Sequence, residues 1–244
     1  MMLKDKSSFV FCKKQQMLNQ IRQNRPDKRE ERMTEKKIDG VILDVDGTLW
    51  NSTEIVAKAW MRAVRDGGGG ELLVTSDMLK GLFGKIMTVI ADCLLPDLSP
   101  EKRYEIMDLC CRYEHEALEN DPCEICYPGV KETIRELSAQ IPVFIVSNCQ
   151  SGYIEMFLKK TGLGPYVKDT ECFGDTGKNK GENIRLLADR NGLCAPTYVG
   201  DTQGDCDASR EAGVPFVYAA YGFGSADSMA AKIESFAELK ELLK

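Results

Sequence analysis

The strongest constraint on the fold of this chain is a short apolar run that ends in two carboxylates. Residues 41–43 (Val-Ile-Leu) lead directly into Asp44-Val45-Asp46-Gly47-Thr48. In parallel α/β sheets, ligands bind beyond the carboxyl ends of the strands. Alternation along an extended chain places Asp44 and Asp46 on the same side, with Asp46 already leaving the strand. This arrangement is typical of a site in which one carboxylate attacks and the other handles a proton, and it favours phosphoryl transfer.

The rest of the chain from residue 38 alternates between short apolar runs and helical periodicity. Strands are expected at 40–45, 142–147, 197–200 and 215–219, with a further short one at 171–173. Helices are expected at 129–140, 151–161, 181–191, 204–212 and 233–243. Short strands separated by helices predict an α/β fold with a doubly wound parallel sheet, Rossmann-like, and right-handed crossovers.

One long segment interrupts this alternation directly after the first strand. Residues 51–127 contain no convincing strand and show helical patterns at 53–65, 76–92 and 100–119. We therefore expect a catalytic core of residues 38–50 and 128–244 and an inserted α-helical cap of residues 51–127. A cap at this position would act as a lid that excludes water and adds substrate contacts. Its segment Gly81-Leu82-Phe83-Gly84-Lys85 is interpreted either as a substrate-contacting loop or as an ordinary turn between helices.

Charge is distributed unevenly along the chain. Residues 1–37 carry a formal charge of +6 and the remainder carries −12. The basic N-terminal extension is polar and is expected to be disordered, and Met33 is a candidate start because the fold-like sequence follows it. An acidic body argues against nucleic acid as a partner, whereas a small anionic substrate fits if a bound cation reverses the local field.

Membrane and redox signals point to a cytoplasmic protein. No run approaches the roughly 20 apolar residues of a membrane span, so no membrane partner is expected. The ten cysteines are scattered through apolar patterns, as reduced buried thiols would be. Cys123 and Cys126 have the spacing of half a zinc site, but no second pair follows them, so we expect two thiols without metal.

Four segments at strand ends or helix starts carry the groups that a phosphoryl transfer needs. Such a reaction requires a nucleophile, hydroxyl and amide donors, a cation and a metal. The four segments are Asp44/Asp46, Ser147-Asn148, Lys178-Asn179-Lys180-Gly181-Glu182 and Gly200-Asp201-Thr202-Gln203-Gly204-Asp205. Each segment alone is a weak or moderate indication of a catalytic site. Because all four occur in this order on strands of one sheet, the alternative that they are ordinary turn residues is disfavoured.

These four segments resemble the four motifs of the haloacid dehalogenase (HAD) superfamily, over residues 38–244. The chain is most similar to the branch of phosphoglycolate phosphatase-like and β-phosphoglucomutase-like members with a helical cap. The resemblance implies that Asp44 attacks phosphorus and forms an aspartyl-phosphate. It implies that Asp46 protonates the leaving oxygen and then activates water. Dehalogenases of this superfamily lack the second aspartate, so Asp46 favours phosphate esters.

The same resemblance implies a Mg²⁺ cofactor, and oxygen-only ligands suit that hard cation. Its ligands would be the Asp44 carboxylate, the Asp46 backbone carbonyl and Asp201, and Asp205 would support this metal shell or orient the lysine. Ser147 and the amides around Asn148 would hold the phosphoryl oxygens.

The catalytic lysine is left open between two positions. Lys180 precedes Gly181-Glu182 as in one motif variant, and Lys178 fits another register in which two expected prolines are missing. Lys180 is the preferred assignment. Thr48 is expected to form a hydrogen bond near the nucleophile and to belong, with Ser147 and Asn148, to the phosphate-binding residues. Gly47 lets the chain turn tightly there.

The predicted function is a Mg²⁺-dependent phosphatase, a phosphomonoesterase acting on a small phosphorylated metabolite such as phosphoglycolate or a sugar phosphate. The alternative is a phosphomutase that uses the same intermediate. A phospho-accepting receiver module is disfavoured, because its acceptor lies on a later strand and no helical lid follows its first strand. The substrate and the choice between monomer and homodimer are not determined by the sequence.

Overall fold

The structure is a computed structural model that describes residues 37–243. The basic extension expected to be disordered, residues 1–37, lies outside the described residues except for Lys37. Within the described part of the chain, no helix is both long and apolar enough to cross a membrane.

Six parallel strands form the central sheet, in the order β3-β2-β1-β4-β5-β6. Sequential strands run outward from β1 in both directions, which confirms the doubly wound α/β fold. The order in which strands are added to the sheet reverses between β1 and β4, and at such a point a crevice opens at the carboxyl ends of the strands. The strands are β1 (Gly40–Leu43), β2 (Val143–Ser147), β3 (Asp169–Cys172), β4 (Pro196–Gly200), β5 (Phe216–Ala219) and β6 (Ala231–Ile233).

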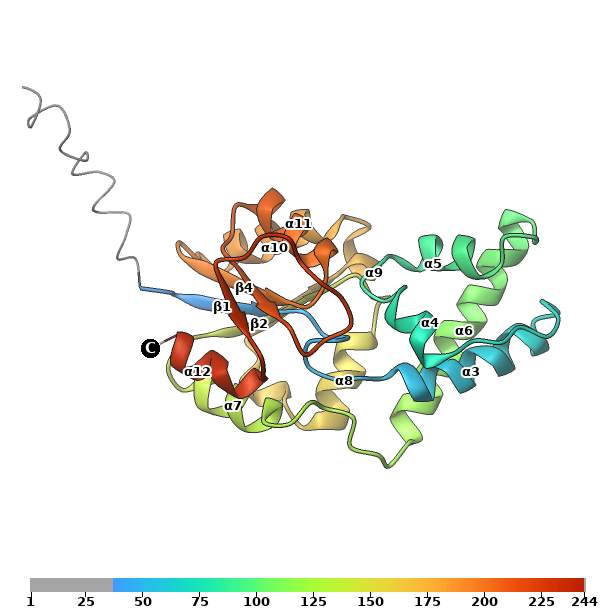
Figure 1. Cartoon of the computed structure of the whole chain (residues 1–244), viewed down its shortest axis with the longest axis horizontal. Coiled ribbons are helices and arrows are strands. Elements are labelled where there is room, and N and C mark those ends of the chain that lie inside the picture. Colours follow the sequence, from blue (N-terminus) through green and yellow to red (C-terminus); the bar gives the residue numbers. More distant parts are fainter. Residues whose placement is uncertain (1–36, 244) are drawn as a thin grey trace, which may run out of the picture. The chain divides into compact units, whose positions relative to one another are not determined.

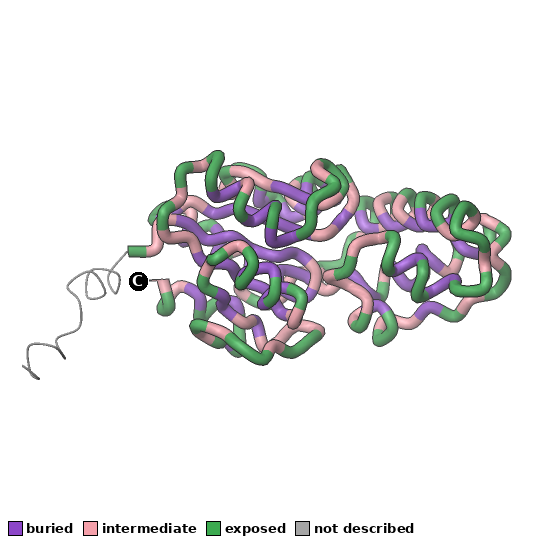
Figure 2. Tube along the Cα trace, turned by 90° about the horizontal axis from the view of Figure 1, so that it is seen from above, coloured by how far each residue is buried: buried purple, intermediate pink, exposed green. Residues whose placement is uncertain are grey.

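Helices cover both faces of the sheet because successive strand residues point to opposite sides. In β1, Val41 and Leu43 pack with the layer that contains α7 and α8, whereas Ile42 packs with the layer of α10 and α11. Figure 2 shows that the buried backbone lies in the interior, whereas the exposed stretches lie on the outside of the molecule. The core helices are α7 (Val130–Ser138), α8 (Tyr153–Thr161), α9 (Phe173–Thr176), α10 (Lys180–Arg190), α11 (Gln203–Ala212) and α12 (Leu239–Leu242), with short 3₁₀ turns η1 (Gly164–Tyr166) and η2 (Phe236–Glu238).

The C-terminal segment differs from the prediction of one helix at 233–243. It begins instead as strand β6, in which Ile233 is buried and pairs with Ala219 of β5. After the extended residue Ser235, only η2 and the short helix α12 follow. The prediction was wrong because a three-residue strand has too little sequence to show alternation, and the apolar spacing beyond it mimics a longer helix.

The segment between β1 and α7 consists mainly of helices and the loops that join them (Figure 1). Its helices are α3 (Thr53–Asp66), α4 (Ser76–Lys80), α5 (Met87–Leu94) and α6 (Pro100–Asn120). The helix predicted at 76–92 is divided into α4 and α5, because Gly84 adopts a positive φ of 87° that interrupts it. Ser99 caps α6 by accepting a hydrogen bond from the Lys102 backbone N–H at 3.3 Å.

Candidate active site

The end of β1 places Asp44 in the interior of the molecule. Asp44 is only 2% exposed, and its backbone N–H donates to Val199 O of β4 at 2.9 Å. The chain then turns at Gly47, whose φ is 85°. A Cβ atom at this residue would lie 2.2 Å from Asp201 Oδ2, so only glycine allows the backbone to approach that carboxylate. The Asp-x-Asp-Gly pattern therefore reflects a close approach between the β1 and β4 loops.

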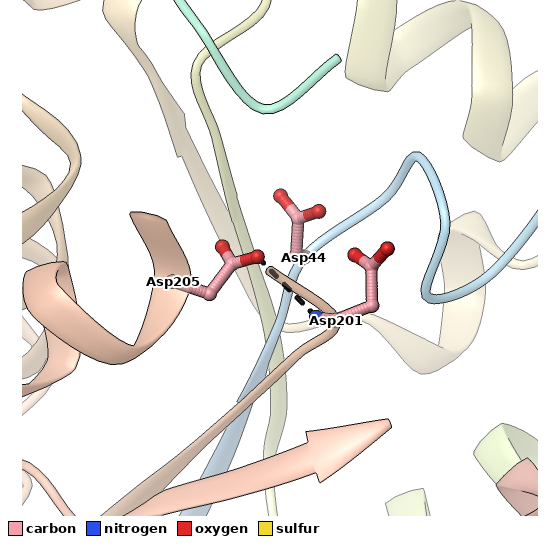
Figure 3. Close-up of side chains that lie close together, drawn as sticks. All are labelled: Asp44, Asp201 and Asp205. Atoms are coloured by element: carbon pink, nitrogen blue, oxygen red, sulfur yellow. Dashed lines mark hydrogen bonds between the residues drawn. The ribbon is translucent and has the colours of Figure 1, made fainter. Parts of the chain in front are cut away.

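Three aspartates gather beyond the carboxyl ends of β1 and β4 (Figure 3). Asp44, Asp201 and Asp205 each offer an oxygen within 4.8 Å of the others, and all three are buried. Asp44 follows β1, Asp201 follows β4, and Asp205 lies in the first turn of α11. The carboxyl group of Asp46 does not belong to this cluster.

Lys180 is the cation that the structure brings to this cluster. Its Nζ donates to Asp44 Oδ1 at 2.8 Å and to Asp205 Oδ1 at 2.7 Å, and the side chain is buried. Lys180 is the first residue of α10 because Asn179 and Glu182 form a capping box there. Burial lowers the pKa of Lys180, but the two carboxylates outweigh it and hold the pKa above its usual value, so the residue stays charged. Lys178 is exposed and lies outside the cluster.

Both carboxylate oxygens of Asp205 accept several hydrogen bonds, and these hold the neighbouring residues in position. Oδ1 accepts from Lys180 and, at 3.0 Å, from Tyr198 OH. Oδ2 accepts from the Thr202 hydroxyl at 2.6 Å and from the backbone N–H groups of Thr202 and Asp201. Burial raises the pKa of Asp205, yet Lys180 and Thr202 more than offset this, and the pKa is lowered. With its lone pairs used, Asp205 is placed to orient Lys180 rather than to bind a ligand directly.

Asp44 and Asp201 retain capacity for a cation. Burial and the repulsion from Asp205 raise the pKa of both groups, in Asp201 to about 7. Within residues 37–243 no donor reaches Asp44 Oδ2, so this oxygen is free to bind. The three carboxylates and one lysine sum to two negative charges when ionised. A hard divalent cation therefore fits the donor set in both charge and ligand type.

Thr48 and the loop after β5 fix the position of Asp201. Thr48 Oγ1 donates to Asp201 Oδ1 at 3.2 Å, and the Phe223 backbone N–H donates to Oδ2 at 2.7 Å. The hydroxyl of Thr48 thus contacts the carboxylate of Asp201, whereas the sequence placed it near the nucleophile and phosphate. At Gly222 a Cβ atom would lie 2.3 Å from the Asp201 Cβ, so this loop also needs glycine at the closest approach.

Asp46 lies beside the cluster, and three hydrogen-bond donors contact one of its carboxylate oxygens. Its Oδ1 accepts from Ser52 Oγ at 2.7 Å, Tyr153 OH at 2.8 Å and Trp50 Nε1 at 2.9 Å. Burial raises the pKa of Asp46, and these three donors partly oppose the effect. Because all three donors occupy Oδ1, a proton on this carboxyl group must reside on Oδ2. The geometry is that of a carboxyl group with one fixed oxygen and one oxygen available for proton transfer.

A small pocket lies over Asp44 and Asp46 and is lined on its other side by residues of the inserted helices. Its volume is about 30 Å³, and its walls include Ser147 and Asn148 at the end of β2. The Asn148 side-chain amide donates to the Gly84 carbonyl at 2.8 Å, which ties the core to the loop between α4 and α5. Phe83, Gly84 and Lys85 line the same pocket, so the 81–85 segment does face the site.

Sequence reasoning missed several residues that the structure places at this site. Glu114 of α6 lines the pocket and is 4% exposed. A signal for it exists, since Glu114 lies four residues from buried Cys110 and from buried Leu118, on the apolar face of its helix. Tyr153 and the Phe223 backbone carry no comparable signal, because their contacts depend on how distant loops meet.

Comparisons with known proteins agree with this geometry. The family described as "Haloacid dehalogenase-like hydrolase" matches residues 41–219. The chain is 28% identical to a phosphoglycolate phosphatase of Vibrio vulnificus, over 84% of this chain and 93% of that protein. It is 25% identical to the pyrophosphatase PpaX of Bacillus velezensis, over 82% and 91% of the two chains.

Among solved structures, a predicted phosphoglycolate phosphatase from Haemophilus somnus superposes with a TM-score of 0.74 at 22% identity, covering 86% of this chain and 99% of the other. That likeness confirms the fold. The expected enzyme class, a phosphomonoesterase, is confirmed by the family match together with the curated relatives. The chain therefore belongs to the haloacid dehalogenase-like hydrolases, and within them it resembles the phosphoglycolate phosphatases.

Proposed function

We propose that this chain is a Mg²⁺-dependent phosphatase that hydrolyses a small phosphate monoester through an aspartyl-phosphate on Asp44. The substrate is of the size of phosphoglycolate or a sugar phosphate. The observation that carries the proposal is the buried cluster of Asp44, Asp201, Asp205 and Lys180, with Asp46 beside the same pocket. Nine free cysteines among residues 37–243 support our assignment to the reducing cytoplasm.

Asp44 is the proposed nucleophile. Lys180 holds Oδ1 and keeps a positive charge next to the carboxylate, while Oδ2 remains without a donor. A lysine at this distance stabilises the negative charge that gathers on the phosphoryl oxygens in the transition state. Ser147 and the backbone amides around Asn148 are proposed to hold those oxygens, since both residues line the pocket over Asp44.

The metal would be held by the Asp44 carboxylate, the Asp46 backbone carbonyl and Asp201. Mg²⁺ supplies charge neutralisation at the phosphoryl group when it is bound. Asp205, whose oxygens are already occupied, keeps Lys180 and the Asp201 loop in position.

Asp46 is the proposed general acid and base. Trp50, Ser52 and Tyr153 hold Oδ1, so the proton on Oδ2 can pass to the leaving oxygen, and the resulting carboxylate can then take a proton from the attacking water. Burial raises the pKa of Tyr153 well above its usual value, so this residue remains a donor throughout.

Replacing Asp46 with asparagine tests this role. We expect kcat/KM for an alkyl phosphate, which reports the formation of the phosphoenzyme, to fall by about 10²- to 10⁴-fold, because the leaving alkoxide then lacks its proton. The loss in kcat/KM should be much smaller for nitrophenyl phosphate, whose leaving group is stable without protonation. Steady-state kinetics with the two substrates measure this difference, and an equal loss for both would show that Asp46 is not the acid.

Removal of the metal provides a second prediction. EDTA should abolish turnover and Mg²⁺ should restore it, and at about 100 times its Kd the ion should raise the free energy of unfolding by about 2.7 kcal/mol. Since the pKa of Asp201 is raised to about 7 without a cation, protons compete with the metal below that pH. Calorimetric titration should show weaker Mg²⁺ binding at about pH 6 than at about pH 8, with proton release. Turnover that survives EDTA would contradict the proposed metal site.

A further inference from the structure

Glu114 is an acidic side chain buried on the cap side of the pocket. It lies on α6 and is 4% exposed, and it lines the same small pocket as Asp44 and Asp46. Its Oε2 accepts a hydrogen bond from Trp60 Nε1 at 2.8 Å. Glu114 is thus held by Trp60 of α3 and lines the pocket that contains the proposed nucleophile and the proposed general acid.

No lysine or arginine of residues 37–243 pairs with Glu114. Burial and the nearby Asp46 raise its pKa to about 8. A buried carboxyl group without a cation is costly, and a neutral glutamine would accept the Trp60 hydrogen bond equally well. A structural role as the partner of Trp60 therefore does not explain why this position is acidic.

Two amide groups that line the same pocket have a buried polar atom without a well-formed hydrogen bond. Asn148 Oδ1 makes no hydrogen bond within the described residues. Gln150 Nε2 makes no well-formed hydrogen bond either, but the Gln150 side chain lies close enough to Glu114 to lower the pKa of that carboxyl group. The pocket wall contains a single Lys or Arg, Lys85, which is exposed and donates to the Gly81 carbonyl. Because the pKa of Glu114 is raised to about 8, this carboxyl group is largely protonated at neutral pH. The cap side of the pocket thus offers acceptor oxygens and, as donors, the Gln150 amide and the Glu114 proton, but no buried positive charge.

This wall is poorly suited to a leaving group that carries a second anion. A carboxylate placed next to Glu114 would lose its hydration without gaining a buried cation, which disfavours binding. An ammonium group would instead donate both to a Glu114 oxygen and to Asn148 Oδ1, and a hydroxyl group would donate to one of them. Donation to Asn148 Oδ1 would satisfy an acceptor that is otherwise unpaired within the described residues.

We propose that Glu114, Asn148 and Gln150 form a specificity site for a leaving alcohol that carries a hydrogen-bond donor, either hydroxyl or ammonium, and no second anionic group. This inference rests on the proposed phosphatase function and narrows its substrate class. It separates the chain from relatives named for phosphoglycolate, whose leaving group carries a carboxylate.

Three phosphate esters of nearly equal size test the proposal: hydroxyethyl phosphate, aminoethyl phosphate and phosphoglycolate. The three leaving groups each have two carbons, so the esters differ mainly in the terminal hydroxyl, ammonium or carboxylate group. We expect kcat/KM for at least one of the first two to exceed that for phosphoglycolate by about tenfold or more. The better of the two identifies the donor as hydroxyl or ammonium. A phosphoglycolate value equal to or above both would overturn the proposal.

A matched pair of variants on α6 assigns this preference to Glu114. Glu114→Gln keeps the size of the side chain and an acceptor for Trp60. It should reduce the ratio of kcat/KM for the preferred ester to kcat/KM for phosphoglycolate by about tenfold. Glu116→Gln is the control, since Glu116 is exposed and pairs only with Arg62 at 3.5 Å, and it should leave the preference unchanged. An unchanged preference in Glu114→Gln, or equal effects of the two substitutions, would refute the role of Glu114.

Nitrophenyl phosphate serves as the reference substrate in every assay. If the wild-type protein fails to hydrolyse even this ester with Mg²⁺ present, the phosphatase function itself fails and the inference fails with it. If the aryl ester is hydrolysed but phosphoglycolate is preferred, only the specificity site is overturned. Should Glu114→Gln not fold, the wild-type comparison of the three esters still decides the proposal.

Discussion

Replacing Asp44 with asparagine is expected to lower kcat for nitrophenyl phosphate by about 10⁵-fold or more, the scale seen when an enzyme loses its nucleophile. Asparagine has almost the same shape, but its amide does not attack phosphorus. Binding of Mg²⁺ should also weaken, because one carboxylate of the cluster is lost. Steady-state kinetics and metal titration measure the two effects.

The fold of this variant should remain intact. Asp44 contributes repulsion to Asp201 and Asp205, and Lys180 keeps Asp205 as a partner after the substitution. We therefore expect cooperative thermal unfolding with a midpoint no lower than that of the wild type in the absence of metal. Substantial turnover by a well-folded Asp44→Asn protein would remove the nucleophile assignment.

Replacing Lys180 with methionine should abolish activity and also destabilise the protein. Methionine fills a similar volume, but it leaves Asp44 and Asp205 buried without their cation. Breaking a buried ion pair in this way typically costs about 3–5 kcal/mol in free energy of unfolding. Lys178→Met is the matched control, because Lys178 is exposed two residues away, and its effect should stay within about 0.5 kcal/mol.

Acid should reduce the difference in stability between wild type and Lys180→Met. In the folded wild type the pKa of Asp205 is below its usual value of 3.8, so its pairing stabilises the fold above that pH. This contribution is lost as the pH falls through the lowered pKa. Denaturant titrations across the acid range measure the effect, and equal losses in the Lys180 and Lys178 variants would contradict the assignment of Lys180.

The part of the site that lies on one continuous motif could be predicted from sequence. Asp44, Asp46 and Gly47 are adjacent in the chain, and their chemistry depends on a strand end and a tight turn, both of which leave local patterns. Asp201 and Asp205 could be predicted in the same way, because their segment, residues 200–205, directly follows a short apolar strand. The parallel sheet could likewise be predicted, because short apolar runs alternate with helical patterns along the chain.

Contacts between distant segments could not be predicted. The choice between Lys180 and Lys178 depends on where α10 begins, and one residue of shift would turn a different side chain inward. Tyr153 reaches Asp46 across 107 residues of sequence, and no local pattern encodes that contact. Glu114 lies on the apolar face of α6, where an acidic residue breaks the pattern of buried apolar side chains. This break is the only local indication of its place at the site.

The most direct test of the central claim is to look for the phosphoryl group on Asp44. In the Asp46→Asn variant the attack on a good ester should proceed while hydrolysis of the intermediate slows, so the phosphoenzyme accumulates. Rapid acid quench, borohydride reduction and peptide mass spectrometry should then find homoserine at position 44 and unmodified residues at 201 and 205. Rapid turnover without any labelled residue, or label on another side chain, would contradict the account.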